Sequence, residues 1–316
     1  MKTLVAIFLA CLVSFAHGAE YAAVGVKVTP IKVGAHSYYV QGLSGAASSA
    51  NEGYMSNAGF VVTPAGVVVF DTLGTPSLAA EMVKQIRKIT RQPIKRVIIS
   101  HYHADHYYGT QVFKALGAEV WAHKNGQGAV NTEAAAGRLA QRKEVLFPWV
   151  DENTHLTPAD KWLDGDTDFD MGGIHFALRY VGPAHSAEDM AMLVQEDGVL
   201  YAGDLVFKGR VPFVGDADSK AWLASLNKLI ALKPRVLVPG HGAVSTAPLA
   251  DLTLTRDYLN YVRAEMGKAV RDLVPFDEAY ARTDWSKYAK LPAFAQANRP
   301  NAYNTYLLME KESLDK

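Results

Sequence analysis

The sequence predicts an α/β protein in which two β-sheets stack as a sandwich and helices cover their outer faces. Two observations support this fold class. Apolar runs rich in β-branched residues alternate with amphipathic stretches of helical spacing along most of the 316 residues. The chain also falls into two halves, each with strands that end in histidine or aspartate. Its length suits one large α/β domain or two smaller ones.

The first eighteen residues have the pattern of a Sec-type signal peptide. Lys2 precedes a mostly apolar stretch, and Ala16 and Gly18 place small residues just before a cleavage point. Cleavage after Gly18 leaves 316 − 18 = 298 residues. We therefore expect an exported protein, located in a bacterial periplasm. An uncleaved N-terminal anchor is the alternative.

Charge and cysteine content exclude several kinds of protein. The 32 basic and 32 acidic residues give a net formal charge of zero, and no basic run indicates a nucleic-acid partner. The only cysteine, Cys11, lies in the expected signal peptide, so the mature chain has no disulfide and no thiolate ligand for a metal. We expect a small-molecule substrate and no stable membrane anchor after signal cleavage, whereas the sequence leaves the oligomeric state open.

In the first half of the chain, short apolar runs separated by turn residues predict strands. Residues 41–58 are small and polar, which is typical of a flexible hairpin or flap. A plain surface connection explains that composition equally well. Asp71 closes the last of the four strands expected here, which are 24–28, 37–40, 60–62 and 67–70.

Apolar residues at helical spacing predict most of the remaining elements. Residues 248–268 and 302–314 are expected to be helices of a C-terminal extension, which covers about residues 246–316 of a single domain, 19–316. The other expected helices are 77–90, 107–116, 125–143 and 219–232, and the other expected strands are 97–99, 119–122, 172–182, 189–202 and 236–239.

Four potential metal ligands follow the expected strand 97–99. His101 and His103 point to the same side of an extended backbone, because side chains alternate along a strand. Asp105 and His106 fall where the chain turns, so they face a second position nearby. Three imidazoles and a carboxylate packed this closely are costly to bury unless a cation holds them. The motif therefore predicts metal binding.

Together with other residues, this motif resembles the metallo-β-lactamase fold superfamily of hydrolases. That family carries His-x-His-x-Asp-His, then a lone His, an Asp and a last His, each at a strand end, and an earlier Asp at another strand end. All of them occur here in the family's order. The matching residues are His101, His103, Asp105 and His106, then His185 in Gly-Pro-Ala-His-Ser, Asp204 in Ala-Gly-Asp, His241 in Pro-Gly-His-Gly, and Asp71 in Val-Phe-Asp.

The resemblance implies a four-layered αββα sandwich and two metal sites. It also implies that Asp204 bridges the two metals and that Asp71 hydrogen-bonds a ligating imidazole, as such sites usually require. By the same resemblance, one metal is held by His101, His103 and His185, and the other by Asp105, His106 and His241.

These ligand types indicate the metal and its chemistry. Imidazoles combined with carboxylate oxygens suit two Zn²⁺, although iron and manganese remain open. A hydroxide held between two cations about 3.5–4 Å apart is a nucleophile at neutral pH. Asp105 is the expected catalytic residue, since its second oxygen can orient that hydroxide and pass its proton to the leaving group.

The layout is most similar to exported glyoxalase II-like hydrolases and to those linked to sulfur-oxidation and quinoprotein systems. This similarity favours cleavage of an ester or thioester. A β-lactamase is the alternative, but Asp204 stands where its B1 branch has a metal-binding cysteine, and Lys208 lies one residue beyond that branch's carboxylate-binding lysine. Lactone hydrolysis needs the same machinery, and a non-catalytic metal-binding protein is the alternative from another class.

Residues near the ligands suggest substrate contacts. Lys208 and Arg210 follow Asp204 closely and are candidates to meet an anionic group, although a solvated loop explains them as well. Tyr54 is a candidate to pack on an apolar part of the substrate. The four remaining histidines of the mature chain are expected to be structural: His36, His123, His155 and His175.

Overall fold

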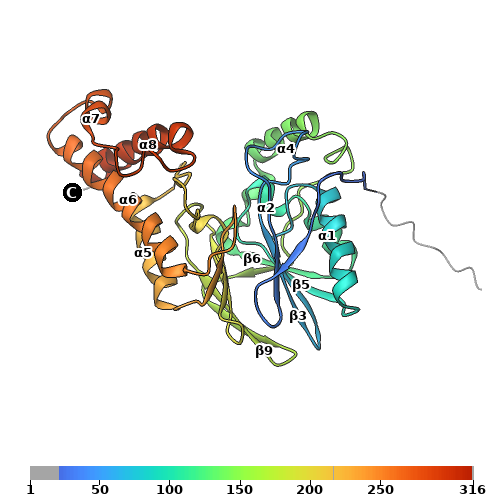
Figure 1. The fold of residues 1–316 in the computed structure, drawn as a ribbon. Coiled ribbons are helices and arrows are strands. Elements are labelled where there is room, and N and C mark those ends of the chain that lie inside the picture. The colour runs from blue at the N-terminus through green and yellow to red at the C-terminus, as the bar shows by residue number, and fades with distance from the viewer. Residues whose placement is uncertain (1–20, 216, 315–316) are drawn as a thin grey trace, which may run out of the picture.

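The computed structural model describes residues 21–215 and 217–314 (Figure 1). The expected signal peptide lies outside these residues. Two β-sheets pack face to face, with helices on the outer side of each, so the predicted α/β sandwich is confirmed. Within the described residues, no helix has both the length and the apolar content needed to cross a membrane.

The first sheet has seven strands in sequence order, β1-β2-β3-β4-β5-β6-β7. Its first four strands are antiparallel, and β4 to β7 run parallel, which requires the helical crossovers that follow β4, β5 and β6. The strands are β1 Pro30–Lys32, β2 Ser37–Val40, β3 Ala58–Thr63, β4 Gly66–Phe70, β5 Ile94–Ile98, β6 Glu119–His123 and β7 Lys161–Leu163.

The second sheet has five strands in the order β12-β11-β10-β9-β8. All its pairings are antiparallel except the one between β11 and β12. The strands are β8 Thr167–Met171, β9 Ile174–Tyr180, β10 Met190–Val194, β11 Val199–Tyr201 and β12 Val236–Val238.

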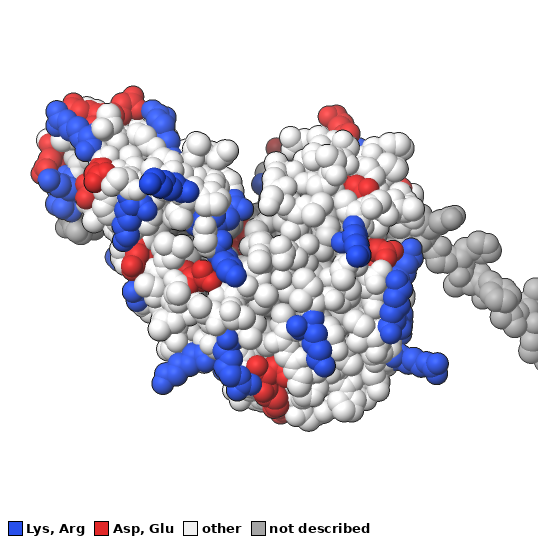
Figure 2. Space-filling view, in the orientation of Figure 1, with Lys and Arg blue, Asp and Glu red and all other residues white. Residues whose placement is uncertain are grey.

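Helices cover the outer faces, and those of the C-terminal part stand together at one end of the molecule (Figure 1). Figure 2 shows a hollow between these C-terminal helices and the lobe that carries α4. The helices are α1 Pro76–Ile89, α2 Ala104–Tyr107, α3 Thr110–Ala115, α4 Glu133–Val145, α5 Ser219–Ala231, α6 Pro248–Arg271, α7 Phe276–Arg282 and α8 Phe294–Leu314, with 3₁₀ turns η1 Lys124–Gly126, η2 Ala129–Asn131 and η3 Gly203–Leu205.

The hydrophobic core consists of three clusters, which lie between the four layers of helices and sheets. In β4 every residue is buried, and successive side chains enter different clusters. Val67 and Val69 pack with the α1 residues Leu78 and Met82, whereas Val68 packs with Phe176 of the second sheet. A third cluster joins the outer face of the second sheet to α5, α6 and α8. A strand buried on both faces in this way is typical of a sheet between two layers.

Several predicted elements differ from the structure. Residues 24–28 are not a strand. Their apolar side chains alternate, but the backbone N–H groups of Gly25 and Val26 donate to the Glu52 carboxylate instead of to a neighbouring strand. The predicted helix 125–143 begins only at Glu133, because Thr132 caps it through a hydrogen bond from the Ala135 N–H.

Other boundaries also moved. The predicted strand 189–202 is a hairpin, β10 and β11, and 172–182 narrows to β9 with β8 paired beside it. The predicted helix 107–116 is two short helices, α2 and α3. The last helix begins at Phe294 rather than at residue 302, and it contains Pro300. Helix α7 was not predicted from the sequence.

Candidate metal centre

The first candidate ligands lie where β5 ends and α2 begins. The backbone continues from β5 with a hydrogen bond from Ile99 N–H to the Trp121 carbonyl, which extends the sheet by one residue. The chain then turns, and His103 precedes the short helix α2, whose first turn carries Asp105 and His106. The two parts of the motif join different groups: His101 and His103 lie in one, and Asp105 and His106 lie in the other.

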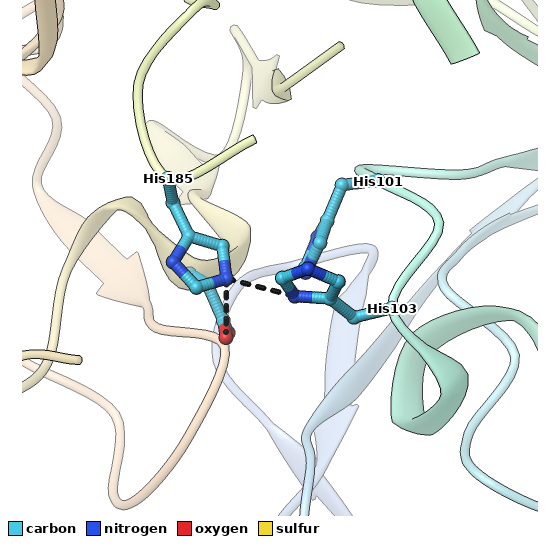
Figure 3. Close-up of side chains that lie close together, drawn as sticks. His101, His103 and His185 are labelled. Carbon is cyan, nitrogen blue, oxygen red and sulfur yellow. Dashed lines mark hydrogen bonds and ion pairs between the residues drawn. The ribbon is translucent and has the colours of Figure 1, made fainter. Parts of the chain in front are cut away.

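Four side chains form the first group. One ligand atom from each of His101, His103, His185 and Asp204 lies within 4.8 Å of the others. His185 Nε2 is 2.9 Å from His103 Nδ1 and 3.4 Å from Asp204 Oδ2. Figure 3 shows the three imidazoles converging from two different loops on a common space. The structure thus brings together the first set of predicted ligands.

Asp105, His106 and His241 form the second group. Oδ2 of Asp105 lies 3.5 Å from Nε2 of His106 and 3.3 Å from Nε2 of His241. His241 follows β12 and its Nδ1 lies 2.7 Å from the Met55 carbonyl oxygen, which fixes the ring.

The carboxylate of Asp204 touches both groups. Its Oδ1 lies 3.2 Å from His106 Nε2, and its Oδ2 lies 3.3 Å from His241 Nε2 and 3.4 Å from His185 Nε2. This is the position required of a ligand that bridges two cations. Gly240 makes the approach possible, because a Cβ at that residue would lie 1.9 Å from Asp204 Oδ1.

Three of these buried atoms make no hydrogen bond of good geometry with any described residue: His101 Nε2, His106 Nε2 and Asp204 Oδ1, the last two of which face each other at 3.2 Å as an ion pair. Buried polar atoms without a partner are costly. A cation at each group would satisfy them. Nitrogen-rich ligands with hard oxygens also match zinc. The residues present therefore fit two metal ions, one per group, with Asp204 between them.

Electrostatics differ between the two groups. Burial lowers the pKa of His101, and it lowers the pKa of His185 to about 4 despite the opposing charge of Asp204. Burial alone would also lower the pKa of His241, but Asp204 and Asp105 outweigh it and raise that pKa to about 10. The first group is therefore ready to bind a cation, whereas the second holds protons that a metal must displace.

The two aspartates remain ionised. Burial alone would raise the pKa of Asp204, but His241 and His106 hold it well below its ordinary range. The pKa of Asp105 is likewise lowered, since His106 and His241 outweigh the effect of burial. Both side chains are therefore carboxylates at neutral pH, the form that binds a metal.

Asp71 supports both groups through hydrogen bonds. Its Oδ2 lies 2.9 Å from Nδ1 of His106. Its two oxygens also accept hydrogen bonds from Ser100 N–H and Oγ, at 2.7 and 2.8 Å, and that Oγ is 2.9 Å from His101 Nδ1. The backbone of Asp71 is left-handed, with φ 61°, which aims the side chain back under the ligands.

Sequence reasoning missed two acidic residues that hold the ligand loops. Glu188 Oε1 accepts the Tyr102 N–H at 3.0 Å, so it joins the loop after β9 to the backbone between His101 and His103. Asp189 accepts hydrogen bonds from Ser186 N–H and Oγ at 2.6 and 2.8 Å, directly beside His185. Their place straight after the His185 turn is the only signal in the sequence.

The three candidate substrate-binding residues, Tyr54, Lys208 and Arg210, differ in their burial and in their hydrogen-bond partners. Tyr54 is 1% exposed and packs in the core under the first sheet. Lys208 Nζ donates to the Val244 carbonyl at 2.7 Å. Arg210 has its Nε buried without a partner among the described residues, and its guanidinium carbon lies 5.6 and 5.2 Å from the ring centroids of Phe207 and Phe213.

Phe207 connects this arginine to the metal centre. Its ring stacks on His241 at 6.0 Å and lies 6.1 Å from the ring of His185, so it touches a ligand of each group. Phe213 is 43% exposed. Neither phenylalanine was predicted. The four other histidines of the described chain belong to neither group, and His36 pairs with Asp197 at 3.1 Å.

Comparison with known proteins decides the family. Residues 51–241 match the family model described as the metallo-beta-lactamase superfamily. The chain belongs to the metallo-β-lactamase superfamily. The predicted family and its four-layered sandwich are thereby confirmed.

Superfamily members similar in sequence include a linear primary-alkylsulfatase from Pseudomonas sp., 24% identical over 238 residues, which covers 64% of this chain and 45% of that protein. A metallo-beta-lactamase type 2 from Elizabethkingia meningoseptica is 25% identical over 193 residues, covering 60% of this chain and 69% of that protein. The chain thus spans less than half the length of the alkylsulfatase. These relatives are named as hydrolases.

Solved structures share the fold. A metallo-beta-lactamase from Pontibacter korlensis aligns with a TM-score of 0.58 and 21% identity, over 74% of this chain and 99% of that one. An inverting secondary alkylsulfatase from Pseudomonas sp. aligns with a TM-score of 0.66 and 19% identity, over 89% of this chain and 50% of that one.

Proposed function

We propose that this superfamily member is a dinuclear zinc hydrolase that cleaves an ester or thioester bond. The observation that carries the proposal is the position of Asp204, whose two oxygens reach ligands of both groups. A carboxylate in that place offsets the repulsion between two cations. Two bound Zn²⁺ ions would act as Lewis acids on the scissile group and generate a nucleophile from water at neutral pH.

Asp105 is the proposed catalytic residue of this chain. Its Oδ2 faces His106 and His241, and its side chain keeps 14% of its surface exposed, more than Asp204 does at 6%. As a carboxylate it accepts a hydrogen bond from the attacking water, orients it, and passes the proton to the departing oxygen or sulfur.

Arg210 is the residue we propose for recognition of an anionic substrate group. A buried guanidinium nitrogen without a partner favours a ligand with an oxyanion, because such a nitrogen is costly to leave unpaired. Phe207 and Phe213 flank the guanidinium and suit an apolar part of the same substrate. Lys208 is a weaker candidate, since its ammonium is already bonded to Val244, and the buried Tyr54 weaker still.

Hydrolysis of a sulfate ester is the second candidate. One observation favours it: the alkylsulfatase structure aligns over 89% of this chain, against 74% for the lactamase. A sulfate ester also carries the anionic group that Arg210 suits. Hydrolysis of a β-lactam or a lactone uses the same machinery and belongs in the same test.

The proposal is tested with zinc-loaded protein on matched substrates. We expect turnover of an ester or thioester that is abolished by a chelator and restored by Zn²⁺, with iron or manganese restoring less. Turnover of alkyl sulfates alone would replace the first candidate by the second. Unchanged turnover after complete removal of metal would refute both.

Export to the periplasm is also proposed, and it rests on the sequence of residues 2–18 alone. Sequencing the N-terminus of the protein from a periplasmic fraction tests it. We expect a chain that begins at Ala19. A chain that still begins at Met1 and sediments with membranes would favour the uncleaved anchor.

A further inference from the structure

Residues 207–215, here termed the wall loop, carry the side chains that border the metal centre. Phe207 stacks on the metal-centre residue His241, and the guanidinium of Arg210 stands against Phe207 and Phe213. The loop connects η3, which contains Asp204, to α5. Its conformation therefore decides where an aromatic and cationic surface meets a substrate.

The C-terminal helices hold the wall loop in place. The Asn301 side chain on α8 brackets Phe213: its Nδ2 donates to the Pro212 carbonyl at 2.6 Å, and its Oδ1 accepts the Val214 N–H at 2.9 Å. Two further bonds join the same parts. Val211 N–H donates to the Pro292 carbonyl at 3.0 Å, and Asn304 Nδ2 donates to the Gly215 carbonyl at 2.7 Å.

Asn301 is itself firmly fixed. It is 1% exposed, and its Nδ2 also donates to Tyr258 Oη at 3.0 Å. That hydroxyl donates onward to Asn298 Oδ1 at 2.9 Å, and Asn298 Nδ2 donates to Tyr280 Oη at 3.0 Å. A buried amide with its donors and acceptor satisfied has one orientation, because any rotation would leave polar atoms unpaired.

We propose that Asn301 is a positioning residue through which the C-terminal helices set substrate selectivity. Its side chain holds the backbone on both sides of Phe213 and thereby fixes the Phe213 ring, beside which the Arg210 guanidinium lies. The selected substrates are those with an anionic group beside an apolar part. The proposal rests on the proposed hydrolase function for the identity of the reaction. The hydrogen bonds between Asn301 and the wall loop, here termed the clamp, do not depend on that function. The candidate ligand Asp204 precedes the wall loop in η3 and the other candidate ligands lie elsewhere in the chain, so a change at Asn301 removes none of them.

The kinetic test compares Asn301→Ala with Thr305→Ala, a control one turn later on α8 whose side chain is equally buried and makes no hydrogen bond with any described residue. Zinc-loaded variants are assayed on 4-nitrophenyl hemisuccinate and on the neutral 4-nitrophenyl butyrate. We expect Asn301→Ala to raise KM for the anionic ester about tenfold, with kcat and zinc content within about twofold of the parent. Thr305→Ala should leave KM unchanged. Equal KM values in the two variants would overturn the proposal.

Two measurements need no turnover, so they decide the clamp even if the protein hydrolyses neither ester and the proposed function fails. Amide exchange at Val214 should be faster in Asn301→Ala than in Thr305→Ala. Benzoate should bind the zinc-loaded parent and bind about tenfold more weakly to Arg210→Ala and Asn301→Ala. Unchanged exchange and unchanged affinity in Asn301→Ala would overturn the proposal.

A milder variant covers the case in which Asn301→Ala does not fold. Asn304→Ala removes only the bond to the Gly215 carbonyl and lies at a less buried site. It should show the same changes, in the same direction and smaller. A folded Asn304→Ala with parental exchange across residues 211–215 would also count against the clamp.

Discussion

The Asp71 carboxylate lies 2.9 Å from Nδ1 of His106 and, through Ser100, also supports His101. A single buried residue therefore orients one imidazole of each metal group. Such partners fix the tautomer of a ligating imidazole and raise its basicity. The two groups therefore share Asp71 as a hydrogen-bonding support, in addition to Asp204, which lies between them.

Replacing Asp71 with asparagine should weaken both metals. The amide keeps the size of the side chain but loses the charge that faces His106 Nδ1. We expect metal affinity to fall about 10–100-fold, as is usual when such a partner is lost. Competition with a chromophoric chelator measures it. Parental affinity at both groups would mean that Asp71 only caps the end of β4.

Histidine substitutions should divide according to position. His101→Ala and His185→Ala each remove a ligand of the first group, so we expect loss of metal and a fall in turnover of at least about 100-fold. His36→Ala and His155→Ala are the controls, because both lie outside the two groups. Activity within several-fold is expected for them. Equal damage from His155→Ala and His185→Ala would contradict the ligand assignment.

Metal binding should release protons from only one group. The pKa of His241 is raised to about 10 and that of His106 is well above its ordinary value, so both carry a proton at pH 7 in the metal-free protein. The pKa of His185 is lowered to about 4, and that of His101 is also lowered. Calorimetry in buffers of different ionisation enthalpy should show about two protons released with one metal and about none with the other.

The same shifts set the pH dependence of stability in the metal-free protein. A raised pKa in the folded state means that protonated His241 stabilises the fold. This contribution is complete below the unfolded pKa of about 6.5 and is lost as the pH rises through about 10. The midpoint temperature of thermal unfolding of the metal-free protein should therefore decrease as the pH is raised from 7 to 10. A midpoint that rises over this range would show that the protons are not bound there.

Gly240→Ala should disrupt the proposed Asp204 bridge without removing any candidate ligand. A Cβ at residue 240 would lie 1.9 Å from Asp204 Oδ1 and 2.7 Å from the Gly203 carbonyl carbon. Either the Asp204 side chain or the loop before His241 must move. We expect loss of one metal equivalent and of most turnover, by elemental analysis and assay. Gly242→Ala is a poor control because its φ is 89°, whereas Gly137→Ala on α4 has open space and serves as one.

The sequence was most informative where chemistry is local. His101, His103, Asp105 and His106 lie within six residues, and the strand before them was predicted from its apolar residues. The structure brings these four together with His185, Asp204 and His241, as expected. Candidate ligands at strand ends are predictable because strands that run in the same direction end at the same edge of a sheet.

Contacts between distant segments were not predictable. Glu188 meets the Tyr102 N–H across 86 residues, and Asn301 meets the wall loop across 87 and 89. Nothing in the spacing of either residue indicates its partner. The prediction of a strand over residues 24–28 was wrong for a related reason. Alternation of apolar residues predicts an extended backbone but does not indicate whether another strand lies beside it.

The proposed bridging role of Asp204 is tested most directly by counting metals in the parent protein and in Asp204→Asn. The amide keeps the size of the carboxylate but loses its charge and replaces one oxygen with a poor ligand. Elemental analysis of protein purified without chelators should give about two zinc ions per chain for the parent and about one for Asp204→Asn, with turnover greatly reduced. Two tightly bound metals and near-parental turnover in Asp204→Asn would contradict the account.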